Sequence, residues 1–342
     1  MTPRWRRVAA LAAVALTLPL GGCATGYVLR GAYEEARLLW RREPIDRMLQ
    51  RDDVDTATRH KLELVLGVRQ FAADELGLRV GDSYTSVARV DSGQIVHVVS
   101  AAPRDRLVPY TWWFPIVGRV PYRGYFKRAE ADALAAELER DGYDTLVRPA
   151  VAFSTLGWFA DPVPSTMLRL DDARLAETII HELLHNTLYV SGQAAFNESF
   201  ATFVGMHGAQ AYFAARGGGE NAILTARRWA DALRFSRFLR AAIARLEAAY
   251  AGGIDEASRQ VLFEELQAQF RAEPWETDSF ASFATQPLNN AVLVHDRLYA
   301  DRLDAFDAAL RDRGGDLRAT IAAVSAAARD ATDPYAALTA QR

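Results

Sequence analysis

The stretch TIIHELLHNTLYVSGQAAFNESFATFVG, residues 178–205, places two acidic side chains in a strongly apolar segment. Between Thr178 and Ala215 the only formally charged residues are Glu182 and Glu198, although charged residues make up 24% of the chain. Burying an unpaired carboxylate is costly, so each acid needs a partner such as a metal cation or a proton. The segment therefore predicts a buried ionic site rather than an ordinary core helix.

The first half of this stretch contains the pattern HExxH, with His181 and His185 separated by one helical turn. Positions i and i+4 lie about 40° apart around a helix, so both imidazoles can reach one ion from the same face. Neutral imidazole is a good zinc ligand. Glu182, the residue after His181, is expected to take a proton from the attacking water and deliver it to the leaving amine.

Glu198 is the expected third ligand. Ser191 and Gly192 can end the first helix and Asn197 can cap a second one. A short turn would then let the two helices run antiparallel, with Glu198 facing both histidines. Two histidines, one glutamate and an open fourth position are typical of catalytic zinc sites. His207 is a rival ligand, but it lies nine residues past Glu198 and off its helical face.

The histidines have two alternative interpretations. A metzincin needs HExxHxxGxxH, and this class is excluded because Leu188 and Ser191 occupy the glycine and third-histidine positions. The second alternative is that the histidines are hydrogen-bonded core residues, with Glu198 paired to an arginine from elsewhere in the chain.

The N-terminus reads MTPRWRRVAALAAVALTLPLGGC, in which a basic start precedes an apolar run over residues 8–20. This pattern is typical of a secretory signal, and it is too short for a permanent membrane helix. LGGC resembles a bacterial lipobox, which would make Cys23, the one cysteine of the chain, a lipidation site. The alternative is an ordinary signal peptide with a chance cysteine. Residues 1–22 are thus expected to be removed, leaving 23–342 as a single domain. Ala24 in place of aspartate favours, by resemblance to Gram-negative lipoproteins, the outer membrane facing the periplasm.

The remaining sequence predicts a helix-rich α+β domain with a small sheet in its first half. We expect two or three helices within 26–78, a hairpin over 80–101 turning at 91–93, a helix over 129–142 and a strand from 143 with Pro149 at an edge or bulge. Later helices are expected at roughly 197–215, 221–251, 254–272, 289–312 and 316–329. With 40 basic and 43 acidic residues, the chain gives no reason to propose a nucleic-acid partner.

HELLHNTLYVSGQAAFNESFATFVG, together with VPYRGYF, GWFADPVPSTML and LNNAVLVHDRLY, resembles a bacterial lipoprotein family known as putative zinc aminopeptidases. The resemblance spans roughly residues 26–335. It implies a gluzincin-like metallopeptidase that binds Zn²⁺ and acts on peptides, with His181, His185 and Glu198 as ligands and Glu182 as the base. The chain departs from thermolysin-like enzymes in its shorter interval between His185 and Glu198. It also lacks the GAMEN motif of the large zinc aminopeptidases.

The resemblance further implies an edge strand that pairs with the substrate and a donor that stabilises the oxyanion. Residues 146–155 are the candidate strand, with a core strand as the alternative, and Tyr299 and His295 are the candidate donors. The aromatic segment 110–114 can form a groove wall, a membrane contact or core. His60 and His97 are expected to be incidental. Two rival functions stay open: a catalytically inactive zinc-binding lipoprotein that serves as a partner-binding or assembly factor, and a structural lipoprotein whose motif is incidental.

Overall fold

The computed structural model describes residues 40–90, 96–114, 118–150 and 160–339. The chain divides into two units, residues 1–41 and 42–342, and nearly all described residues belong to the second. The signal peptide, Cys23, the turn expected at 91–93 and the continuation of the candidate strand beyond residue 150 lie outside the described residues. Among the described residues, no helix combines the length and the apolar composition needed to cross a bilayer.

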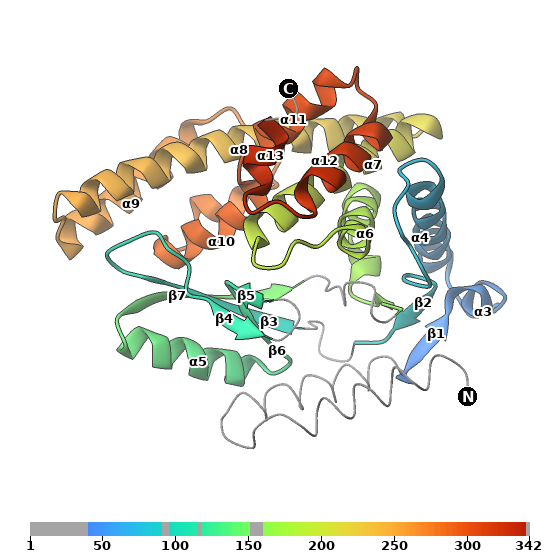
Figure 1. The fold of residues 1–342 in the computed structure, drawn as a ribbon. Helices are drawn as coiled ribbons and strands as arrows, with labels where there is room; N and C mark the ends of the chain where they lie inside the picture. Colours follow the sequence, from blue (N-terminus) through green and yellow to red (C-terminus); the bar gives the residue numbers. More distant parts are fainter. Residues whose placement is uncertain (1–39, 91–95, 115–117, 151–159, 340–342) are drawn as a thin grey trace. The chain divides into compact units, whose positions relative to one another are not determined.

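Helices dominate the second unit, which confirms the predicted α+β class (Figure 1). They are α3 (Ile45–Leu49), α4 (Thr56–Asp74), α5 (Arg128–Arg140), α6 (Asp172–Thr187), α7 (Ala194–Ala215), α8 (Gly219–Ala251), α9 (Glu256–Ala272), α10 (Asn290–Ala300), α11 (Leu303–Asp312), α12 (Leu317–Ala328) and α13 (Pro334–Thr339), with 3-10 turns η1 (Met167–Arg169) and η2 (Ala281–Ala284). Most helices from α5 onward lie within a few residues of their predicted ranges.

The strands are short and form three small sheets. They are β1 (Arg42–Pro44), β2 (Ser86–Ala88), β3 (Val96–Pro103), β4 (Trp112–Phe114), β5 (Gly118–Val120), β6 (Arg123–Tyr125), β7 (Tyr143–Ala150) and β8 (Val163–Pro164). The sheet orders are β1-β2-β8, β6-β3-β7 and β4-β5. The β6-β3-β7 sheet is antiparallel and lies between α5 on one face and α10 on the other (Figure 1).

The predicted hairpin over 80–101 is wrong. Its two runs do form strands, but β2 pairs with β1 and β8 whereas β3 pairs with β6 and β7. The physical reason is the longer partner available to β3. This strand pairs with β7 over eight residue pairs, from Val96 with Ala150 to Pro103 with Tyr143. The prediction for the strand that contains Pro149 is confirmed, because β7 lies at the edge of its sheet.

Two helix ends have clear local causes. Asp171 caps α6 because its carboxylate accepts a hydrogen bond from the backbone NH of Arg174 at 2.8 Å. The helix predicted over 289–312 is instead two helices, α10 and α11. The chain turns between them at Arg302, which has a left-handed φ of 48° that a helix interior does not accept.

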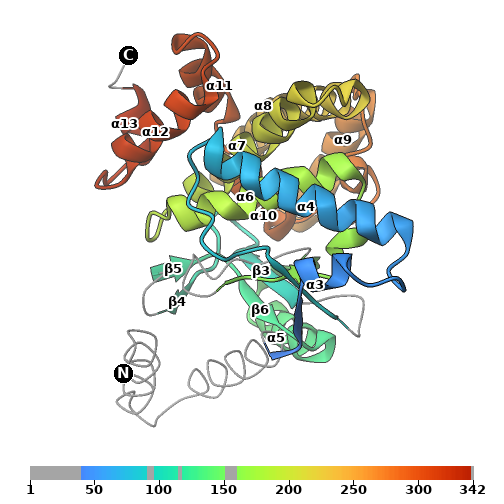
Figure 2. The ribbon, with the colours of Figure 1, turned by 90° about the vertical axis from the view of Figure 1, so that its right-hand side faces the viewer.

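Among the described residues, the buried side chains of α6 and α7 belong to the larger hydrophobic cluster. The two helices run side by side, α4 packs against them, and α8 packs along α7 (Figure 2). The long uncharged face of α7 is buried against these neighbours, including Phe196, Phe200 and Phe203. The segment 178–205, which contains HExxH and Glu198, is therefore also part of the main hydrophobic core.

Candidate metal centre

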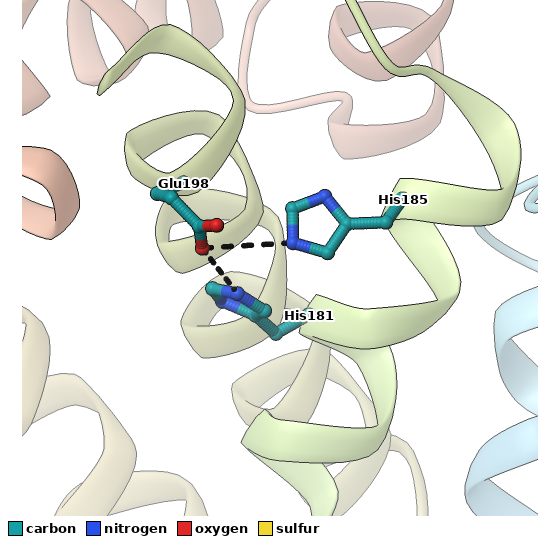
Figure 3. Close-up of side chains that lie close together, drawn as sticks. All are labelled: His181, His185 and Glu198. Atoms are coloured by element: carbon teal, nitrogen blue, oxygen red, sulfur yellow. Dashed lines mark hydrogen bonds and ion pairs between the residues drawn. The ribbon is translucent and has the colours of Figure 1, made fainter. Parts of the chain in front are cut away.

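The α6–α7 pair brings His181, His185 and Glu198 to one point, as predicted (Figure 3). The Nε2 atom of His181 lies 3.2 Å from Oε2 of Glu198, and Nε2 of His185 lies 3.6 Å from the same oxygen. One ligand atom from each residue lies within 4.8 Å of the others. This is the group among the described residues that can hold a metal ion.

The donor set and its spacing fit a divalent cation. Atoms bound at about 2.0–2.1 Å to a tetrahedral ion lie roughly 3.3–3.4 Å from one another. The two nitrogen–oxygen distances, 3.2 and 3.6 Å, fall on either side of that spacing. Two imidazoles and one carboxylate also leave one coordination position for water or substrate. The three side chains therefore fit a catalytic type of metal site better than a closed structural one.

Small residues let the two helices approach closely enough to form this site. A Cβ atom at Gly205 would lie 2.7 Å from the carbonyl oxygen of Glu177 and 3.2 Å from Cβ of His181. One turn further on, a Cβ atom at Gly208 would lie 3.0 Å from the Ile180 side chain. Both glycines therefore mark places where a larger residue would separate α7 from α6.

Asn197 positions Glu198, but by a different contact from the predicted cap. Gln193, not Asn197, is the N-cap of α7, and Asn197 lies inside the helix. Its Oδ1 accepts a hydrogen bond from the backbone NH of Val190 at 2.9 Å, and its Nδ2 donates to the carbonyl of Val190 at 2.8 Å. Gly192, with a φ of 76°, closes the same turn. The turn between the helices is thereby tied to the residue next to the ligand.

Glu182 points into the same region from α6 and has the environment of a proton acceptor. Burial raises the pKa of its carboxyl, while the nearby His181 and His185 oppose that shift. For Glu198, burial alone would also raise the pKa, but the charge of His185 and the hydrogen bonds from both histidines hold it below its ordinary value. The environments of the two carboxylates thus differ: the pKa of Glu198 is lowered, whereas that of Glu182 is raised.

Tyr122 is a site residue that the sequence analysis missed. It lies between β5 and β6, and its hydroxyl donates a hydrogen bond to Oε1 of Glu198 at 3.3 Å. Burial, followed by the charge of Glu198, raises the pKa of this hydroxyl well above its usual value, so it remains a donor. The motif VPYRGYF contributed to the resemblance, but no spacing rule distinguishes this tyrosine from the other aromatic residues near it.

A cavity of about 660 Å³ opens onto the three ligands and Glu182. Tyr299 and His295, the two expected donors, both lie in its wall. The ring of Tyr299 stacks near His181, with 6.2 Å between ring centroids. His295 shares a hydrogen bond of 3.0 Å between its Nδ1 and Oγ of Ser100, and burial lowers its pKa to about 4. At neutral pH it is therefore an uncharged group.

Strand β7 also reaches this cavity, through Arg148, Pro149 and Ala150. Of the candidate substrate strand, residues 148–150 thus line the cavity, at the edge of their sheet. Arg148 is held there by hydrogen bonds to Asp296 and Gln286, both 2.8 Å long. The edge position agrees with the substrate-strand prediction for the described part of the segment.

The other singled-out residues lie away from the centre. His207 packs between Phe203 and Trp229, with 4.8 Å between ring centroids in each case, and it does not belong to the metal-binding group. It is therefore a core histidine and not the third ligand.

His60 and His97 are likewise outside the described cavity walls. His60 contacts the carboxylate of Asp172 at 2.7 Å, and His97 is buried in β3. In the aromatic segment 110–114, Tyr110 and Trp112 pack onto the small α5 core whereas Trp113 is exposed. This segment is core with one exposed side and does not line the metal cavity.

Comparison with known proteins identifies a family for this chain. Residues 26–335 match the protein family described as "Putative aminopeptidase". The comparisons with curated proteins and with solved structures give no match. The family match covers most of the chain and includes every residue of the metal-binding group, together with Glu182 and Tyr122. The chain belongs to the "Putative aminopeptidase" family.

Proposed function

We propose that this protein is a zinc-dependent peptidase that hydrolyses peptide bonds with an activated water molecule. The observation that carries the proposal is the convergence of His181, His185 and Glu198 inside a cavity, with Glu182 beside them. Membership of an aminopeptidase family supports a peptide as the substrate. When bound, zinc supplies a Lewis acid that makes water a competent nucleophile near neutral pH.

The residues of this chain then have separate roles. Glu182 takes the proton of the attacking water and passes it to the amine of the departing product. Tyr122 holds the Glu198 carboxylate in place through its 3.3 Å hydrogen bond. Tyr299 and His295 are proposed as donors to the oxygen that becomes negatively charged in the reaction, because both face the cavity.

The proposal extends to the location of the protein. Cys23 carries a lipid anchor and, with Ala24 following it, the protein is held at the outer membrane and faces the periplasm. This rests on the N-terminal sequence alone. Incorporation of labelled palmitate that persists in Cys23→Ser would contradict it.

Replacing Glu182 by glutamine tests the enzymatic part. Glutamine keeps the shape of the side chain but cannot accept the proton, so we expect peptide turnover to fall by about 10²–10⁴-fold. Zinc content and the unfolding temperature should stay at wild-type values. The measurement is product formation from a peptide mixture, followed by mass spectrometry.

Two results would count against this account. Unchanged turnover in Glu182→Gln would show that another group is the base. A wild-type protein that binds zinc but cleaves no peptide would favour the inactive, partner-binding alternative.

A further inference from the structure

The cavity extends well past the metal centre, along the facing sides of α6 and α7. Thr202 and Met206 continue its wall one and two turns beyond Glu198, and Glu177 continues it one turn before His181. At about 1.5 Å of rise per residue, the wall runs roughly 12 Å from Glu198 to Met206. A cavity of about 660 Å³ with this extent can hold a substrate side chain next to the bond that is broken.

The wall of this extension is formed mainly by apolar side chains. We call it the apolar arm, and it is lined by Met206, Ala232, Phe235, Phe280 and Phe283. Phe235 and Phe280 stack with 4.3 Å between ring centroids, and Phe283 meets Phe235 edge-on at 5.4 Å. Phe235 and Phe283 are almost fully buried, so their packed rings form a fixed surface rather than a flexible one.

The charged groups at the far end of the arm are already paired. Glu177 lies 3.1 Å from a guanidinium nitrogen of Arg174 and 3.4 Å from one of Arg228. Arg228 is also bound to Asp171 at 2.8 Å. A cationic side chain entering here would meet Arg174, and an anionic one would meet Glu177. Neither charge gains a free partner, so the arm favours a neutral apolar group.

We propose that the apolar arm is a specificity pocket for one large apolar side chain, aliphatic or aromatic, adjacent to the bond that is cleaved. The inference rests on the proposed function and adds to it the class of substrate. Apolar pockets with a few polar groups at one end are typical of small-ligand recognition. Discrimination comes from the apolar surface that a large side chain buries and that glycine cannot.

Binding of amino-acid hydroxamates to the zinc-loaded full chain tests this directly, because a hydroxamate chelates the metal and leaves its side chain to occupy the pocket. Calorimetry would compare the phenylalanine and leucine compounds with those of glycine, aspartate and lysine. We expect the phenylalanine and leucine compounds to bind at least tenfold more tightly than the other three. Equal affinities would overturn the inference.

Two variants change the arm in different ways. Ala232→Leu fills it, and should reduce the affinity ratio between the phenylalanine and glycine compounds at least fivefold. Phe280→Ala removes a partly exposed wall residue and should lower the affinity for the leucine compound, with less risk to folding than a change at a buried site. The matched control is Phe238→Ala, which removes a ring that packs on Phe283 without lining the cavity. The control should keep the wild-type ratio.

Zinc content is measured on the same samples, so that a failure of the specificity pocket can be told apart from a failure of the metal centre. If zinc binds but the affinity ratio between the phenylalanine and glycine compounds is near one, the pocket is overturned and the metal centre is not. The same holds if neither Ala232→Leu nor Phe280→Ala changes that ratio. Absence of zinc from the wild-type protein after loading contradicts the proposed function and, with it, the pocket.

Discussion

The α6–α7 pair and the strand region from β2 to β7 differ in how far apart in the chain their essential contacts lie. His181 and His185 share a face because of helix geometry alone, and Glu198 follows after a short turn. In the strand region, Val98 of β3 pairs with Arg148 of β7, fifty residues later. Contacts set by a local repeat are readable from sequence, whereas contacts set by distant pairing are not. Variants in the strand region and in the helix pair test this difference separately.

The largest effect is expected where the strand region is joined to the helices. Asp144 of β7 accepts hydrogen bonds from both terminal nitrogens of Arg259 in α9, at 2.9 and 3.2 Å, and one from the backbone NH of Asn290 at the start of α10. Asp144→Ala leaves a buried guanidinium without its main partner, so we expect a loss of about 3–5 kcal/mol in the free energy of unfolding. Urea denaturation measures it.

The control for this change is Asp141→Ala, at an exposed carboxylate just before the strand. It should alter the free energy of unfolding by less than about 0.5 kcal/mol. Folded Asp144→Ala protein should still bind zinc in wild-type amount. Loss of zinc from folded protein would show that the metal centre depends on the sheet more closely than the comparison implies.

A second test uses the histidine of α7 that is not a ligand. Burial lowers the pKa of His207 to about 4, against a small opposing effect of Asp307. Because the folded pKa lies below the unfolded one, the folded protein binds fewer protons, and stability falls as the pH drops from about 6.5 to 4. The shift corresponds to at most about 3 kcal/mol at the acid end of that window.

His207→Gln should remove this part of the acid sensitivity, which denaturation curves at pH 7, 5.5 and 4 would show. An unchanged dependence on pH would mean that His207 is not the neutral core residue described here. The zinc content at neutral pH should not change in this variant.

The smallest change tests the approach of the two helices. Gly205→Ala puts a methyl group 2.7 Å from the Glu177 carbonyl, so α7 must shift. We expect a loss of about 1–3 kcal/mol in the free energy of unfolding and weaker zinc binding, because Glu198 is on the displaced helix. The control is Gly219→Ala, at the start of α8, where an added Cβ meets nothing within 4 Å. If both variants bind zinc equally, the close approach at Gly205 is not what positions the ligands.

The difference between the helix pair and the strand region also explains which predictions were confirmed. The HExxH helix and the antiparallel return to Glu198 both follow from helix periodicity and a turn of few residues. The prediction that Asn197 caps the second helix was wrong, because Asn197 lies inside α7 and Gln193 is its N-cap. The hydrogen bonds of Asn197 to Val190 depend on the path of the turn itself.

The features that could not be predicted from the sequence depend on tertiary contacts. Tyr122 reaches Glu198 only because the β5–β6 region lies over the helix pair. The false hairpin came from two strands that were adjacent in sequence, of which β3 has a longer partner elsewhere. The break at Arg302 between α10 and α11 has no glycine or proline to announce it.

The central claim is that three side chains hold one zinc ion, and metal content tests it most directly. Purified wild-type protein, Glu198→Ala and His207→Gln would be loaded with zinc, dialysed and measured by elemental analysis. The account predicts about one zinc per chain in the wild type and in His207→Gln, and weakened or lost zinc in Glu198→Ala. Full retention by Glu198→Ala would contradict the three-ligand site, and no zinc in the wild type would leave the two histidines as core residues.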